Sequence, residues 1–161
     1  QLPFKDSSFN FVVSNSAYQW VNDLPFAFSE ARRVLKKQGI FFFCVFGAET
    51  LKELRFCIDK IRPGSGFFLL PRKDKLKSDL ISSGFRDIEL ICEARCHNYT
   101  DIMEILHWLK YTGTSYSEGS FFTGLGGRSF ISRLRQLYES YFRNSDGLAM
   151  TYEAVLARAR K

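Results

Sequence analysis

Short runs of consecutive apolar residues alternate along this chain with segments in which apolar residues recur every three or four positions. The apolar runs lie at Phe9–Ser14, Ile40–Phe46 and Ile88–Ala94, and runs of this kind are typical of strands covered on both faces of a sheet. Turn residues, Asp6-Ser-Ser8, precede the first run. The pattern predicts an α/β protein with a largely buried sheet.

A helix is predicted between the first two strands. Its apolar positions follow helical spacing, with Asn22 or Asp23 as the N-terminal cap and Pro25 in the first turn. Lys36, Lys37 and Gly39 are expected to end it, with Gly39 taking the positive φ that the turn requires. Strand, helix and strand at this spacing predict a right-handed βαβ unit.

Further helices are predicted after the second strand. One follows Gly47 and ends at 62–66, with Thr50 as its expected cap. A short basic helix covers 72–83 and ends at Gly84, and a third follows Thr100, which is its expected cap. The apolar residues expected on their inner faces are Leu51, Leu54, Ile58, Ile61, Leu76, Leu80, Ile81, Ile102, Ile105, Leu106 and Leu109.

The last third of the chain has a Gly/Ser-rich loop at 113–127, a helix at about 129–142 and a turn at 144–147. The helix is expected to bury Tyr138 and Tyr141 and to expose Arg133 and Arg135. The final segment, 151–161, has mixed helix and strand propensity. A strand is predicted there because of the resemblance described below.

The composition is that of a globular protein, with 161 residues, 45% apolar and 25% charged residues, and no stretch long enough to span a bilayer. No signal peptide pattern is present, and a cytoplasmic location is expected. The net charge of +6 suits an acidic partner or a generally basic surface. No basic run is interleaved with aromatics, so neither nucleic acid nor a membrane is the expected partner.

Cysteines and histidines are few. Cys44, Cys57, Cys92 and Cys96 lie scattered through apolar segments, which favours packed thiols over disulfides. Cys92-x3-Cys96-His97 lacks a second ligand pair at zinc spacing, so no metal site is predicted. His97 and His107 are expected to be structural, because no catalytic triad arrangement accompanies them.

An ordered set of motifs resembles the class I S-adenosylmethionine-dependent methyltransferases, whose fold is Rossmann-like. The motifs are Leu2-Pro-Phe-x-Asp-Ser-Ser-Phe9, Val13-Ser-Asn-x-Ala-x-Gln-Trp20, Asn22-Asp-Leu-Pro25 and Arg33-Val-Leu-Lys36. Two further motifs resemble the malonyl-acyl-carrier-protein O-methyltransferases of biotin synthesis. These are Phe46-Gly-x-x-Thr-Leu-x-Glu-Leu-Arg55 and Asp146-Gly-Leu-x-x-Thr-Tyr-Glu153.

The resemblance implies the second half of a seven-stranded sheet whose last strand is antiparallel. Residues 1–95 would form the sheet and helix core, 96–147 a helical insertion on the substrate side, and 148–161 the last strand. The family's first half, with its Gly-rich turn and ribose-binding acid, has no counterpart here. We therefore expect the 161 residues alone to bind cofactor weakly or not at all, and the bare edge of the first strand to be prone to pairing with another chain.

The resemblance also implies where S-adenosylmethionine would bind. Gln1 and Leu2 match the end of the loop beside adenine, and Ser14, Asn15 and Ala17 match the floor under the methionine part. Trp20, in the loop after the first strand, either walls the cofactor or fills the core. This placement agrees with the rule that ligands of open α/β sheets bind beyond the carboxyl ends of the strands.

By the same resemblance, the reaction moves a methyl group to the free carboxylate of a malonyl thioester. Such a carboxylate is already ionised near neutral pH, so no catalytic base is predicted. Arg55 is the candidate for holding it, although it could also pair with nearby acids on the helix surface. Thr50 and Tyr152 are further candidates for substrate contact.

The resemblance implies malonyl-acyl-carrier protein, or malonyl-CoA, as the substrate. Arg128, Arg133, Arg135 and Arg143 would suit an acidic carrier protein, and a solvated helix face explains them equally well. Two other functions are considered: an arginine-hydroxylating protein like the related complex I assembly factor, and a non-catalytic module that binds the carrier protein. Thr151-Tyr-Glu153 favours the methyltransferase over the hydroxylase.

Overall fold

The computed structural model describes residues 1–64, 69–111 and 128–161. These residues form two compact units. Unit 1 comprises Gln1–Thr50, Leu70–Ala94 and Glu153–Lys161, and unit 2 comprises Leu51–Leu69 and Arg95–Tyr152. The Gly/Ser-rich loop expected at 113–127 lies outside the described residues.

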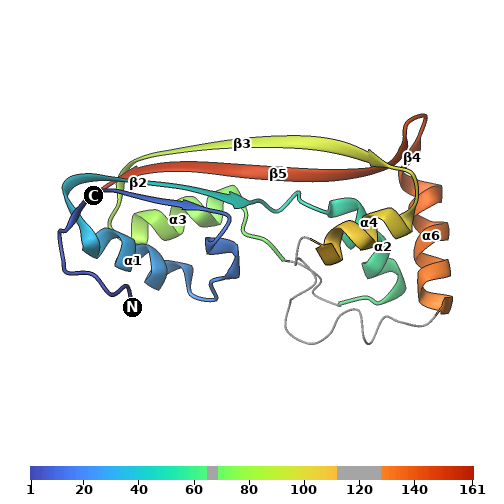
Figure 1. Cartoon of the computed structure of the whole chain (residues 1–161), viewed down its shortest axis with the longest axis horizontal. Helices are drawn as coiled ribbons and strands as arrows, with labels where there is room; N and C mark the ends of the chain where they lie inside the picture. Colours follow the sequence, from blue (N-terminus) through green and yellow to red (C-terminus); the bar gives the residue numbers. More distant parts are fainter. Residues whose placement is uncertain (65–68, 112–127) are drawn as a thin grey trace. The chain divides into compact units, whose positions relative to one another are not determined.

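The strands are β1 (Phe9–Asn15), β2 (Leu35–Phe46), β3 (Arg86–Tyr99), β4 (Arg143–Asn144) and β5 (Gly147–Arg160) (Figure 1). The described residues form one sheet in the order β1-β2-β5-β3, with β4 beside β5. β1 and β2 are parallel, whereas β2 and β5 are antiparallel. The βαβ unit and the antiparallel last strand predicted from the sequence are therefore confirmed.

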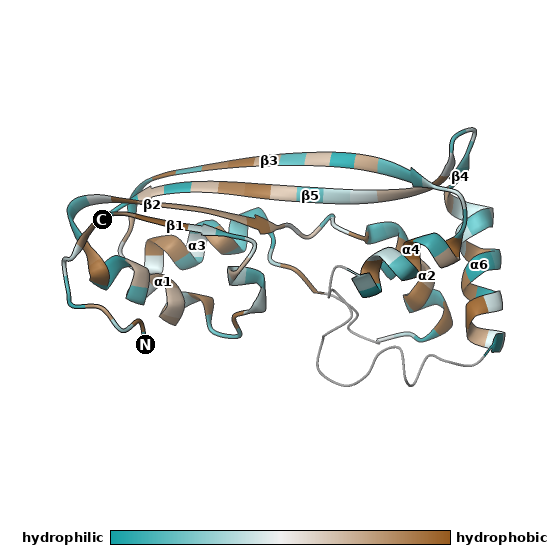
Figure 2. Cartoon of the chain, in the orientation of Figure 1, coloured by the Kyte–Doolittle hydropathy of each residue, from teal (hydrophilic) through white to brown (hydrophobic). Residues whose placement is uncertain are grey.

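Unit 1 has its core where helices α1 (Leu24–Val34) and α3 (Lys73–Ser82) pack on the sheet. Asp23 caps α1, because its carboxylate accepts a hydrogen bond from the Phe26 N–H at 3.0 Å. Figure 2 shows the apolar part of β2 as a brown stretch. The aromatic centre of this core is formed by Tyr18, Phe28, Phe41, Phe43 and Phe85.

Unit 2 is a helical cluster made of α2 (Lys52–Ile61), α4 (Ile102–Tyr111) and α6 (Arg128–Phe142). Each helix places apolar residues at helical spacing into one core, which includes Leu54, Ile58, Ile105, Leu134 and Tyr138. α2 belongs to the same compact unit as α4 and α6. The division expected from the sequence, with residues 1–95 as the sheet and helix core and 96–147 as an insertion, stays a prediction.

The turn between α1 and β2 differs from the prediction. The positive φ falls on Gln38, at 66°, and not on Gly39. β2 begins directly after α1, at Leu35, and its register with β1 shifts between Phe9 and Phe11. A Cβ on Gly39 would lie 2.9 Å from Lys36 O and 3.1 Å from Asn10 O. Gly39 therefore permits close backbone approach, and Gln38 carries the backbone strain.

Two predicted helix caps are wrong. The residue before α2 is Leu51 in the left-handed conformation, and no side chain caps this helix. The hydroxyl of Thr50 instead donates to Glu153 O at 3.1 Å. At α4, the Asp101 carboxylate accepts hydrogen bonds from the N–H groups of Met103 and Glu104, whereas Thr100 binds the Glu104 side chain.

Two inner-face predictions are also wrong: Ile81 on α3 and Tyr141 on α6 are exposed. The predicted end of α3 before Gly84 is confirmed, and Gly84 has a positive φ of 86°. None of the helices in the described ranges is long and apolar enough to cross a membrane.

β1 forms an edge of the sheet, with β2 on one side. Phe11 and Val13 on this strand are 60% and 72% exposed. The bare apolar edge expected from the sequence is therefore present in the structure, and it borders the pocket described next.

Candidate functional site

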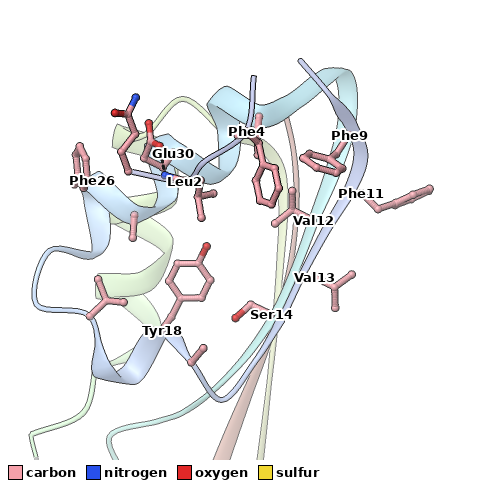
Figure 3. Close-up of a pocket in the computed structure, with 15 residues that line it drawn as sticks. Leu2, Phe4, Phe9, Phe11, Val12, Val13, Ser14, Tyr18, Phe26 and Glu30 are labelled. Atoms are coloured by element: carbon pink, nitrogen blue, oxygen red, sulfur yellow. Dashed lines mark hydrogen bonds between the residues drawn. The ribbon is translucent and has the colours of Figure 1, made fainter. Parts of the chain in front are cut away.

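A pocket of about 650 Å³ lies alongside β1 and α1 in unit 1 (Figure 3). Gln1, Leu2, Ser14 and Ala17, four of the six residues predicted to bind cofactor, line it. Figure 3 shows the side chains of Ser14 and Tyr18 pointing into it. The structure thus brings together residues from the start of the chain, the end of β1 and the loop that follows.

Asn15 and Trp20 are not among the residues that line this pocket. The Asn15 side-chain oxygen accepts a hydrogen bond from the Ser16 hydroxyl at 3.2 Å. Trp20 lies in the short 3-10 helix η1 (Tyr18–Trp20) and is 49% exposed. It therefore does not fill the core, which was one of the two roles considered for it.

Glu30 and Arg33 of α1 hold the first residues of the chain beside the pocket. The Leu2 N–H donates to Glu30 Oε2 at 2.8 Å, and Arg33 donates to Leu2 O at 3.0 Å and to Phe4 O at 2.8 Å. Arg33 also pairs with Asp6 at 2.6 Å and with Glu30 at 2.8 Å. This network orders the segment that supplies Gln1 and Leu2 to the pocket.

The Glu30 carboxylate is held in its ionised form. The hydrogen bond from Arg33, followed by the bond from the Leu2 N–H, lowers the pKa of Glu30 to about 2. Sequence reasoning missed this residue, because an acid three positions before an arginine on a helix usually forms an ordinary surface pair. Glu30 holds the pocket segment only because the first residues of the chain fold back over α1 and bring the Leu2 N–H to its carboxylate.

Most of the pocket wall is apolar. Phe4, Phe9, Val12, Phe26 and Val34 contribute to it, and such walls suit the faces of a flat heterocycle such as adenine. The polar groups are the Ser14 hydroxyl, the Tyr18 hydroxyl, Gln1 and Glu30. Burial raises the pKa of Tyr18 to about 12, so its phenol is neutral at ordinary pH.

Glu30 is the acidic residue among the described residues that line the pocket. Its carboxylate already accepts hydrogen bonds from Arg33 and from the Leu2 N–H. The described pocket therefore fits the adenine part of S-adenosylmethionine better than its ribose hydroxyls, which usually bind to an acidic side chain in such folds.

The residues considered for substrate contact are found in both units. Thr50 is 2% exposed. Its hydroxyl donates to Glu153 O at 3.1 Å and accepts from the Glu153 N–H at 3.0 Å. In unit 1, Thr50 therefore joins the segment after β2 to β5 through the backbone. Arg55 lies on α2 in unit 2 and is half-buried.

Tyr152, on β5 in unit 2, lies among aromatic residues that were not predicted as its neighbours. Its hydroxyl is hydrogen-bonded to that of Tyr99 at 2.9 Å. The rings of Trp108 and His97 meet its ring edge-on, with centroids at 5.0 and 5.5 Å. Sequence reasoning missed Tyr99 because it ended the third strand at Ala94, whereas β3 continues to Tyr99.

All four arginines proposed as a partner surface are exposed. Arg128, Arg133 and Arg135 are on α6, and Arg143 is on β4. Arg143 makes a long contact of 3.4 Å with Glu139. The ion pair between Arg143 and Glu139 is long and lies on the surface, so it contributes little to stability. Exposed guanidinium groups of this kind are able to bind an acidic partner.

Comparison with known proteins agrees with this geometry. Residues 1–43 match a methyltransferase domain family. Two solved structures superpose on the whole chain: a putative methyltransferase from Bacillus halodurans (TM-score 0.60, 20% identity, 68% of that chain) and the YcgJ protein from Bacillus subtilis (TM-score 0.62, 17% identity, 67% of that chain). The fold is that of the class I S-adenosylmethionine-dependent methyltransferases, as predicted.

The sequence is further related to a particular group within that class. It is 33% identical, over 96% of its length, to a malonyl-[acyl-carrier protein] O-methyltransferase from Geobacter sulfurreducens, and 34% identical, over its full length, to one from Methylovorus sp.. The chain spans 60% and 54% of these two relatives. The resemblance to this group that the motifs indicated is confirmed.

Proposed function

We propose that this protein takes part in methyl transfer from S-adenosylmethionine to the free carboxylate of malonyl-acyl-carrier protein, or of malonyl-CoA, in biotin synthesis in the cytoplasm. The observation that carries this proposal is the sequence relationship to malonyl-[acyl-carrier protein] O-methyltransferases over essentially the whole chain. The pocket beside β1 supports it, because four residues expected to contact the cofactor line one cavity.

Bound in this pocket, S-adenosylmethionine would supply a methyl group on a positively charged sulfur. Gln1 and Leu2 would lie against the adenine, and Ser14 and Ala17 beneath the methionine part. Asn15 and Trp20 remain candidates for contact at the margin of the site. Glu30 and Arg33 would act indirectly, by holding the segment that contains Leu2.

The chain's own residues need not move a proton, since a malonyl carboxylate is already ionised near neutral pH. Their tasks are to align the two reactants and exclude water, which can lower a barrier by roughly 7 to 11 kcal/mol. We assign Arg55 and Tyr152 to the carboxylate-bearing substrate. Thr50 would support the site by joining the segment after β2 to β5.

The carrier protein would dock on the arginines of α6 and β4. Arg128, Arg133, Arg135 and Arg143 are all exposed, and the chain has a net charge of +6. Charge complementarity between these arginines and an acidic partner would mainly accelerate association. Its effect decreases as salt is added, because salt screens exposed charges. Association with malonyl-acyl-carrier protein is therefore expected to weaken between low and moderate ionic strength.

A non-catalytic module that binds the carrier protein is the second candidate. It is favoured by one observation: the carboxylate that lines the described pocket is occupied by Arg33 and the Leu2 N–H. On this basis the 161 residues are expected to bind the cofactor weakly when tested alone.

Two measurements test the proposal. Calorimetry measures binding of S-adenosylmethionine and of malonyl-acyl-carrier protein, and a radiolabelled methyl assay measures ester formation. Arg55→Ala is expected to raise KM for the malonyl substrate at least tenfold, because a guanidinium bond to a carboxylate is charge-assisted. Lys60→Ala, an exposed cation on the same helix, serves as the matched control. Carrier-protein binding without cofactor binding or ester formation would favour the non-catalytic module.

A further inference from the structure

Two tyrosine hydroxyls form a pair in unit 2. Tyr99 ends β3, and Tyr152 lies on β5, the neighbour of β3 in the sheet (Figure 1). Their oxygens are 2.9 Å apart, and either can be the donor. Each phenol has one proton, so the bond between them uses one proton and leaves the other for a different acceptor. The pair therefore has a fixed geometry and one hydroxyl proton that the bond between the two tyrosines does not use.

The surrounding rings fix the orientation of this pair. Trp108 meets the Tyr152 ring at 61° and His97 meets it at 74°, both edge-on. Edge-to-face contacts of this kind favour one ring position over others. Tyr99 and Tyr152 are both half-buried. A hydrogen bond donated in such partly dry surroundings is electrostatically stronger than the same bond in water.

Tyr152 keeps its proton over the range in which an enzyme works. Burial raises its pKa well above the usual value for tyrosine, and the hydrogen bond to Tyr99 and nearby negative groups, including Glu53, raise it further. The pair is thus a neutral donor and not a phenolate. A neutral donor can bind an anion without adding a charge of its own.

We infer that the Tyr99–Tyr152 hydroxyl pair binds one oxygen of the carboxylate that is to be methylated, with Tyr152 as the substrate-binding residue and Tyr99 as a positioning residue. This inference rests on the proposed function and assigns roles to residues within it. It makes Tyr99, Trp108 and His97 determinants of specificity for an acyl group that ends in a carboxylate.

Binding through one donor suits the chemistry of the reaction. A single hydroxyl holds one carboxylate oxygen and leaves the lone pairs of the other oxygen available for reaction with the methyl carbon. That oxygen forms the new C–O bond while the bond between methyl carbon and sulfur breaks, and its electron pair stays on sulfur. The products are a methyl ester and a neutral thioether, and no proton moves.

The test uses Tyr99→Phe, Tyr152→Phe and the double variant, all of which keep the rings and remove only hydroxyls. Tyr141→Phe, at an exposed tyrosine of α6, is the matched control. Calorimetry measures binding of malonyl-pantetheine and acetyl-pantetheine, and the methyl assay measures kcat and KM. Tyr152→Phe is expected to weaken malonyl-pantetheine binding about 10- to 100-fold, the usual effect of losing a hydrogen bond to a charged group.

Acetyl-pantetheine binding should change less than twofold in every variant, because this ligand has no carboxylate. Tyr99→Phe should show a smaller loss than Tyr152→Phe, and the double variant should be no worse than Tyr152→Phe, since the hydroxyls act as one unit. A merely structural role would weaken both ligands equally.

The possible failures can be distinguished. If the unaltered protein methylates the malonyl thioester and both phenylalanine variants keep its KM, kcat and malonyl preference, the inference is overturned and the proposed function stands. If the unaltered protein neither binds nor methylates the malonyl thioester, the proposed function and the inference are both overturned.

Discussion

Gly47 packs closely against Glu153: a Cβ on Gly47 would overlap the Glu153 carboxylate and would lie 2.7 Å from its Cδ. Glu153 Oε2 also accepts a hydrogen bond from the Glu49 N–H at 2.9 Å, and the Gly47 N–H donates to Glu153 O at 2.9 Å. Together with Thr50, these bonds attach the segment after β2 to β5. The close approach explains why a glycine follows β2.

Gly47→Ala is expected to lower the free energy of unfolding by about 1–3 kcal/mol, because the added methyl group overpacks a buried contact. Removing the carboxylate as well, in Gly47→Ala with Glu153→Ala, should recover part of that loss. Recovery should be incomplete, since the same Cβ would lie 2.8 Å from Val155 Cγ2. Urea denaturation measures both variants, and an unchanged midpoint for Gly47→Ala would contradict the packing argument.

Glu53 is a buried acid whose partner is Thr151. Its carboxylate accepts the Thr151 N–H at 2.9 Å and also the Thr151 hydroxyl. Glu53→Ala would leave a buried N–H unpaired, so we expect it to lower the free energy of unfolding by about 1–3 kcal/mol. Glu139→Ala, at a surface acid of α6 with a long contact to Arg143, should change it by less than about 0.5 kcal/mol. If Glu53→Ala and Glu139→Ala lowered the free energy of unfolding equally in denaturant titrations, the role of Glu53 as the buried partner of Thr151 would be refuted.

Gln38 offers a stabilising substitution. With φ at 66°, its Cβ costs roughly 1–2 kcal/mol of backbone strain. Gln38→Gly removes that strain but increases the entropy of the unfolded chain. The net expectation is a gain of about 0.5–1 kcal/mol. Gln38→Ala keeps the Cβ and should show no gain. Thermal unfolding compares the two, and a gain from alanine would show that strain is not the cause.

The Glu30 and Arg33 network predicts a dependence of stability on pH. The hydrogen bond from Arg33 lowers the pKa of Glu30 to about 2 in the folded chain, from an ordinary value of 4.5. Because the folded pKa is the lower one, the stabilisation is fully present above about pH 4.5 and is lost as the pH falls through about 2. Glu30→Gln should flatten this part of the stability profile, which denaturant titrations at successive pH values would measure.

The four cysteines should differ in their reaction with a thiol reagent. Burial, reinforced by the charge of Glu53, raises the pKa of Cys57 to about 12, and its side chain is fully buried. Cys96 is exposed. In the native protein at pH 8, Cys96 should therefore be modified first, and Cys57 only on unfolding. Mass spectrometry measures the order in which the cysteines are modified, with Cys96→Ser as the control. Labelling of Cys57 before unfolding would contradict the burial of its thiol.

Helices and strands with strong apolar periodicity could be predicted from sequence. The 3.6-residue spacing located α1, α2 and α6, and continuous apolar runs located β1 and β2, because burial of one face requires these patterns. Ends of elements were less predictable. β3 extends to Tyr99 along its neighbour β5, so partner strands, and not local propensity, set its length.

The candidate site was predictable in part. Ser14, Ala17, Gln1 and Leu2 line one pocket, and the carboxyl end of a strand in an α/β sheet is a recurrent binding position. Contact of these residues with the cofactor stays a prediction. The hydrogen bonds between Leu2 and Glu30 and between Thr50 and Glu153 were not predictable. They join residues 28 and 103 positions apart in sequence, and no local pattern marks such a partner.

The sequence by itself determined the α/β class, the βαβ unit and the relationship to methyltransferases, because periodicity and ordered motifs are local properties of the chain. The tertiary structure alone decided that Gln38 carries the positive φ, that Trp20 is exposed, and that Tyr99 meets Tyr152. These features arise where segments distant in sequence pack together, and the free energy of those contacts overrides local preference.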